Sequence, residues 1–177
     1  MKNLFKFALC AALLLTGTSA FAQTTASDSA TTTAIIVDLL KINATQNLHF
    51  GEIFSPDSTV TAIVTPEGAA DDSGGAEWQS ELLVKQAIFV IEGRPNATLE
   101  VSLPLGTYEV TNGTPAEDML VGGFAATDAD GVPIIDEITL DADGAGIIWV
   151  GATLTIAEGQ PAGTYTNTGG LLVTVNY

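Results

Sequence analysis

The sequence has one cysteine, one histidine and only five lysine and arginine residues. Cys10 lies in an apolar run near the N-terminus, so the rest of the chain has no disulfide, thiolate nucleophile or thiolate metal ligand. His49 alternates with Leu48 and Phe50 and is expected to point outward, which leaves no basis for a catalytic triad. A phosphate backbone is bound through lysine and arginine, so the scarcity of cations argues against nucleic acid and anionic lipid as partners.

The N-terminus has the three-part layout of a secretory signal. Two lysines precede an apolar run at residues 7–15, and the small residues of a cleavage site stand at residues 20–22. The run is too short for a bilayer span, which needs about 20 residues. We therefore expect residues 1–22 to be a signal peptide and the mature chain to be exported, without membrane insertion, to the periplasm, the cell surface or the medium.

Removal of the signal peptide makes the net charge of the chain more negative. Three cations, Lys41, Lys85 and Arg94, then face all 21 acidic residues, which gives a net charge of −18. The composition predicts a flexible leader at residues 23–33, rich in Thr, Ser and Ala. Residues 34–177 have the length of a single domain with its own core.

Alternation of apolar and polar residues predicts many short strands. It is clearest at residues 60–65, 87–92, 98–103 and 148–156, with Gly, Pro, Asn and Asp turn signals between them. This pattern predicts an all-β fold, an immunoglobulin-like antiparallel β-sandwich. Residues 34–42 are apolar on both alternating faces, and their β-branched content favours a strand over a helix.

Several sequence pieces, in this order, resemble the secreted bacterial family catalogued as domain of unknown function 4402. That family is in turn similar to spore-coat-U and chaperone–usher pilin-like proteins. The pieces are Leu48-His-Phe-Gly-Glu-Ile53, Ala87-Ile-Phe-Val-Ile-Glu-Gly93, Val101-Ser-Leu-Pro104, Leu140-Asp-Ala-Asp-Gly144, Val150-Gly-Ala-Thr-Leu154, Ala162-Gly-Thr-Tyr165 and Val173-Thr-Val-Asn-Tyr177.

The resemblance implies a sandwich that lacks a last strand, which a neighbour's N-terminal extension would supply by strand addition. The expected partners are other surface or pilus subunits, a second copy of this chain included. Residues 35–42 could equally be the domain's own first strand. The candidate donor residues are Ile35, Ile36, Val37, Leu39, Leu40 and Ile42, and the candidate C-terminal edge strand carries Leu171, Val173, Val175 and Tyr177.

Two acidic repeats are weak candidates for calcium. Asp128-Ala-Asp130-Gly131 and Asp141-Ala-Asp143-Gly144 share the same four letters, but neither continues as an EF-hand loop. The simpler interpretation is a pair of Asp-Gly turns with no cofactor.

Trp149 alternates with inward residues and should point outward, and Trp78 stands in a Gly- and acid-rich stretch predicted to be a loop. Either indole could contact a protein or a sugar. The leading hypothesis is a non-enzymatic surface or fimbria-like subunit that assembles by strand pairing. The alternative is a monomeric carbohydrate- or host-binding module, and no catalytic residue is predicted.

Overall fold

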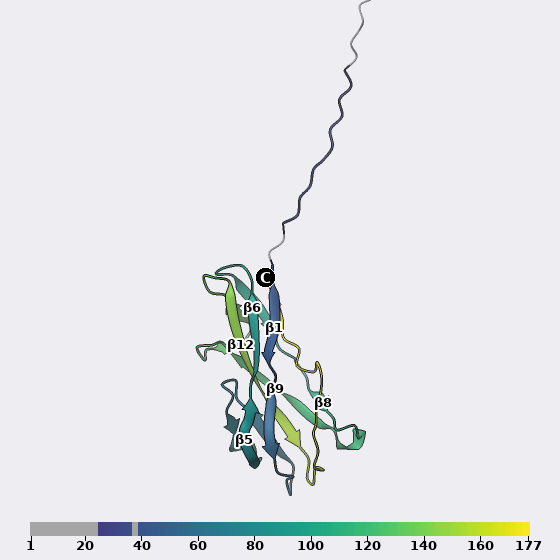
Figure 1. Ribbon diagram of the computed structural model, residues 1–177, viewed down its shortest axis with the longest axis vertical. Helices are drawn as coiled ribbons and strands as arrows, with labels where there is room; N and C mark the ends of the chain where they lie inside the picture. Colours follow the sequence, from purple (N-terminus) through teal and green to yellow (C-terminus); the bar gives the residue numbers. More distant parts are fainter. Residues whose placement is uncertain (1–24, 37–38) are drawn as a thin grey trace, which may run out of the picture. The chain divides into compact units, whose positions relative to one another are not determined.

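The computed structural model describes residues 25–36 and 39–177, so the signal peptide predicted for residues 1–22 lies outside the described residues. The chain divides between Ile36 and Val37 into two units. Residues 25–36 contain no strand or helix. The second unit is an all-β domain built from antiparallel sheets (Figure 1).

The larger sheet is organised around its longest strand, β12 (Ala145–Ile156). The first half of β12 pairs with β6 (Ala87–Glu92) and the second half with β3 (Val60–Val64), while β9 (Met119–Thr127) pairs along the opposite edge. All of these pairs are antiparallel. The outer strands are β1 (Lys41–Gln46) on β6, β4 (Ala70–Asp71) on β3, and β8 (Tyr108–Val110) and β10 (Pro133–Ile134) on β9.

Two smaller sheets complete the domain. In the three-stranded sheet, β7 (Thr98–Ser102) lies between β11 (Glu137–Thr139) and β13 (Thr174–Asn176). The two-stranded sheet joins β2 (His49–Ile53) to β5 (Trp78–Lys85). Short 3-10 turns, η2 (Asp72–Gly74) and η3 (Pro115–Glu117), stand in the connections.

The first core is formed by the larger sheet and the three-stranded sheet. Alternate residues of β6, β7 and β12 point into it, and Ile91, Leu99 and Ile148 are completely buried. Burial of each such side chain contributes about 1.5–3 kcal/mol. The prediction of a sandwich with these strands facing inward is confirmed.

The second core lies along the other half of β12, where Ala152, Leu154 and Ile156 are buried with residues of β3 and β9. The sheet of β2 and β5 packs against it through Phe50 and Trp78. The prediction that Trp78 lies in a loop is therefore wrong. Its indole N–H donates to the carbonyl of Phe50 at 2.7 Å, which ties the ring across the β2–β5 pair.

The predicted strand at residues 34–42 is also wrong in its extent. Strand β1 begins only at Lys41, which pairs with Glu92 at the end of β6. Beyond Glu92 the chain turns, and Pro95 has no N–H to extend a ladder. Ile35 and Ile36 are 84% and 94% exposed, so this stretch is not a strand buried on both faces.

Candidate functional site

Strand β13 has one unpaired edge. It pairs with β7 through Thr174 and Ser102, Val175 and Val101, and Asn176 and Glu100. Across residues 25–36 and 39–177, no strand pairs with its other edge, which we call the open edge. An unpaired strand presents a row of free N–H and C=O groups, which can accept a further strand.

A tyrosine corner identifies the place of β13 in the sandwich. The hydroxyl of Tyr165 donates to the carbonyl of Pro161, four residues earlier, at 2.8 Å. In immunoglobulin-like sandwiches such a tyrosine marks the approach to strand F, and F lies between C and G in its sheet. β13 is the strand that follows this corner, and it lies beside β7.

The larger sheet supports the same assignment. The order β1, β6, β12, β9 reproduces the A-B-E-D sheet of an immunoglobulin-like sandwich. With β7 as strand C and β13 as strand F, no described residue occupies the position of strand G. The open edge is therefore the edge on which strand G lies in a complete sandwich.

Apolar residues at the margins of the first core lie on or next to β1, β7 and β13. Leu40 and Ile42 belong to β1 and its approach, and Leu103 and Leu171 flank β7 and β13. All four pack against the core but are only partly buried. Leu172, just before β13, is 68% exposed. This apolar surface is incompletely covered.

The predicted C-terminal edge strand, residues 171–177, is thus shorter in the structure. Only Thr174–Asn176 are in strand conformation, because the partner strand β7 ends at Ser102 and Pro104 follows soon after. Val173 and Val175 are buried in the core as alternation requires. Leu171 is half-buried, and Tyr177 lies just beyond the strand.

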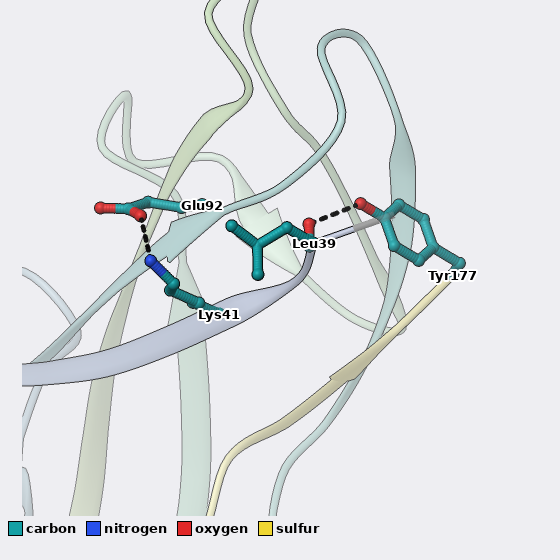
Figure 2. Close-up of polar contacts among 4 residues, drawn as sticks. All are labelled: Leu39, Lys41, Glu92 and Tyr177. Carbon is teal, nitrogen blue, oxygen red and sulfur yellow. Dashed lines mark hydrogen bonds and ion pairs between the residues drawn. The ribbon is translucent and has the colours of Figure 1, made fainter. Parts of the chain in front are cut away.

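Tyr177 joins the open edge to the other sheet. Its hydroxyl accepts a hydrogen bond from the backbone N–H of Arg94 at 2.8 Å. It donates one to the carbonyl of Leu39 at 3.2 Å (Figure 2). The guanidinium carbon of Arg94 lies 5.4 Å from the centre of the Tyr177 ring, within cation–π distance. One side chain therefore contacts both the approach to β1 and the turn after β6.

Residues 40–177 match the sequence family described as Domain of unknown function (DUF4402). The chain belongs to this family. The DUF4402 match begins at Leu40, one residue after the carbonyl that Tyr177 holds, and it contains every strand from β1 to β13. No curated protein matches the sequence significantly.

The DUF4402 boundary separates the predicted donor residues into two groups. Leu40 and Ile42 belong to the matched domain and pack on its core. Ile35, Ile36 and Leu39 precede the match and are exposed, and Val37 lies outside the described residues. The end of this stretch, from Lys41, is therefore the domain's own first strand, whereas Ile35 and Ile36 are exposed and belong to no strand or helix.

The two tryptophans differ in what they can bind. Trp78 is half-buried against the second core, with its N–H already donated. Trp149 is half-exposed on the outer face of β12, directly opposite Ile88 of β6 and Thr127 of β9. Only Trp149 keeps the outward position that the alternation predicts.

The acidic repeats form two equivalent turns. Asp128 Oδ1 accepts the backbone N–H groups of Asp130 and Val132 at 2.9 and 2.8 Å. Asp141 Oδ1 accepts those of Asp143 and Ala145 at the same two distances. In each turn the first aspartate is thus used by its own backbone. No cluster of three or more metal-ligating side chains occurs within residues 25–36 and 39–177.

Carboxylates gather at one shallow hollow, which is lined by Glu100, Val101, Ser102, Asp136 and Glu137. All three acids are exposed. A glycosidase pair needs one acid in an environment that keeps it protonated, which ordinarily means burial. The hollow has the character of a solvated acidic face.

Two groups have shifted pKa values, Asp71 and Tyr108. Hydrogen bonds from the backbone and side chain of Ser73 hold the pKa of Asp71 below its usual value, at the start of η2. Burial raises the pKa of Tyr108, whose ring stacks on Phe124 with centroids 5.7 Å apart. Within the described part of the chain, no helix is long and apolar enough to cross a bilayer.

Proposed function

We propose that this protein is a non-enzymatic, exported surface or fimbria-like subunit that assembles by strand pairing. The observation that carries the proposal is the open edge of β13, where strand G of an immunoglobulin-like sandwich would lie. A strand added there forms main-chain hydrogen bonds with β13, and its alternate side chains cover the partly buried leucines beside it.

The donor that we propose is the N-terminal segment, residues 25–36, of a second copy of the chain. This segment precedes the matched domain and ends in two exposed isoleucines. In an extended strand, Ala30, Thr32, Ala34 and Ile36 share one face, which places small and apolar side chains toward a core. It carries one charge, Asp28, so a strongly acidic acceptor repels it little.

The test compares residues 23–177 with the same chain lacking residues 23–36, by light scattering after size exclusion. The shorter chain keeps Leu39, Leu40 and β1, which belong to the domain's own structure. Polymers that disappear on deletion, from a chain that still unfolds cooperatively, support the proposal. Monomers from both chains contradict it.

A matched pair of variants separates apolar insertion from a general effect of charge. Replacing Ala34 and Ile36 with aspartate should abolish polymers, because both positions lie on the donor face that would enter the core. Replacing Thr31 and Thr33 with aspartate adds the same charge on the opposite face of the donor strand, which does not point toward the core. Equal loss of polymers in both variants would point to electrostatic repulsion and not to strand insertion.

One observation favours the binding-module alternative, namely the half-exposed Trp149 on the outer sheet face. An indole there could stack on a sugar ring. A glycan array with the wild type and Trp149→Ala separates the two functions. Loss of a glycan signal in Trp149→Ala, from a chain that remains monomeric, would favour the module over the subunit.

A further inference from the structure

The register of β1 on β6 places Leu39 opposite Arg94. Lys41 pairs with Glu92 and Ile42 with Ile91, so two further steps bring Leu39 and Arg94 face to face. Gly93 donates its N–H to Gly144 on the β12 side of β6 at 2.8 Å. Backbone groups alternate in direction along a strand, so the N–H of Arg94 points to the β1 side. The carbonyl of Leu39 and the N–H of Arg94 are therefore the groups that the next ladder bond would join.

The Tyr177 hydroxyl stands between these two groups. It accepts from the N–H of Arg94 and donates to the carbonyl of Leu39, in the sequence N–H···O–H···O=C. The β1–β6 ladder of the larger sheet thus ends on a side chain that comes from the three-stranded sheet. Figure 2 shows the ring reaching from the end of β13 to the start of β1.

The space for this hydroxyl depends on Gly93. A Cβ at Gly93 would lie 3.1 Å from the Tyr177 hydroxyl oxygen, 2.8 Å from Leu140 Cδ1 and 3.3 Å from Leu40 Cδ1. The hydroxyl therefore lies in a niche that a side chain at position 93 would fill. With the Arg94 guanidinium over the ring, side chains close this end of the open edge.

We propose that Tyr177 is the register stop of the open edge. A strand added to β13 pairs along it as far as Asn176 and ends there, because Tyr177 leaves the edge and crosses to the other sheet. A slip of one residue would turn the apolar face of the added strand to solvent, so strand addition onto a core needs a fixed register. The inference rests on the proposed function and adds the residue that sets how the donor aligns.

Disulfide trapping tests the register directly, because residues 23–177 contain no cysteine. One chain carries Asn176→Cys, and a second carries a cysteine substitution at each position of residues 25–36 in turn. A disulfide forms only when the Cβ atoms come within about 3.5–4.5 Å. We expect one position of the N-terminal segment to cross-link at least about fivefold more than its neighbours, given this narrow distance range.

Tyr177→Ala in the Asn176→Cys chain should remove the stop. Cross-links should then spread to positions two residues away on either side, since slips by two keep the same face inward. If the same single position cross-links with and without Tyr177, Tyr177 does not set the register, although strand addition itself is still supported. If the Asn176→Cys chain with Tyr177 intact cross-links at no position of residues 25–36, strand addition itself is contradicted.

Tyr177→Phe keeps the ring and removes both hydrogen bonds, which guards against a variant that does not fold. Hydrogen exchange at the Arg94 amide should become about five- to tenfold faster, the loss expected for one hydrogen bond. Tyr108→Phe is the matched control, since that ring stacks on Phe124 and should leave Arg94 exchange unchanged. An unchanged Arg94 rate in Tyr177→Phe would contradict the hydroxyl's place in the ladder.

Discussion

Lys41 and Glu92 face each other across β1 and β6, and the Nζ of Lys41 lies 3.5 Å from Oε2 of Glu92. They are the outermost paired residues of this ladder, next to the Leu39 carbonyl that Tyr177 binds (Figure 2). Two interactions thus meet at the start of the domain: an ion pair at the surface and a tyrosine bridge between sheets. They should contribute differently to the free energy of unfolding.

The ion pair should contribute little to stability. Both side chains are more than half exposed, at 52% and 59%. Lys41→Gln and Glu92→Gln should each lower the free energy of unfolding by less than about 1 kcal/mol, with a coupling of about 0.5 kcal/mol or less, because water and salt screen the pair. Urea unfolding of the two variants and the double variant measures this. A coupling well above 1 kcal/mol would mean that the ion pair, and not Tyr177, holds the start of β1.

The tyrosine corner should contribute more. The Tyr165 hydroxyl donates to Pro161 and accepts from Gln160 Nε2 at 3.1 Å and Asn112 Nδ2 at 3.2 Å. Tyr165→Phe removes the hydroxyl that these partners bind. The loss matters most for Gln160, because that residue is buried. We expect a loss of about 1–3 kcal/mol in the free energy of unfolding. Urea unfolding beside Tyr108→Phe checks this, and equal small losses in the two variants would argue against a structural corner.

Much of the sandwich could be predicted from local alternation, and the site could not. Residues 148–156 alternate over so many positions that only a strand with one face in a core fits them, and β12 has that form. Residues 34–42 are equally apolar, but whether they pair depends on where β6 ends. The bond between Tyr177 and Leu39 joins residues 138 apart in sequence, which no local pattern can reveal. The glycines before Trp78 favour a loop, whereas its partner strand β2 lies far earlier in the chain and leaves no local signal.

The acidic repeats should behave as turns. Asp141→Ala removes an acceptor of two backbone N–H groups and should lower the free energy of unfolding by about 1–2 kcal/mol. Asp143→Ala is the matched control, since its neighbour Asp141 supplies the acceptor in this turn. Calcium at millimolar concentration should leave the melting temperature of the wild type unchanged. A calcium-dependent rise that disappears in Asp141→Ala would instead establish a metal site.

The half-buried phenol of Tyr108 should make the free energy of unfolding fall in strong alkali. Burial raises the pKa of Tyr108 in the folded state. As the pH rises, the unfolded chain therefore loses the phenolic proton first, at about pH 10. Its contribution is complete below about pH 10 and decreases as the pH rises toward the folded-state pKa. Between about pH 9 and 11, the wild type should therefore lose more unfolding free energy than Tyr108→Phe. Urea titrations at the two pH values measure this, and equal losses of unfolding free energy in the wild type and Tyr108→Phe would contradict it.

Gly51 and Gly131 have nearly the same backbone conformation but different surroundings. Their φ angles are +82° and +78°, in the left-handed region that favours glycine. A Cβ at Gly51 would lie 2.8 Å from Val84 Cγ2 and 2.9 Å from the carbonyl oxygen of Ser80, whereas a Cβ at Gly131 would meet nothing within 4 Å.

Gly51 stands where β2 and β5 change register, because Phe50 pairs with Val84 while Glu52 pairs with Ser80. The residues of β5 between Ser80 and Val84 form a bulge opposite it, and one of them, Leu82, is 90% exposed. Gly131→Ala should lower the free energy of unfolding by about 1 kcal/mol, through left-handed strain alone. Gly51→Ala adds a clash with backbone and should cost about 2–4 kcal/mol. Chemical unfolding of the two variants measures the difference. Equal losses would show that the β5 backbone can move away, and that the bulge opposite Gly51 does not depend on its missing side chain.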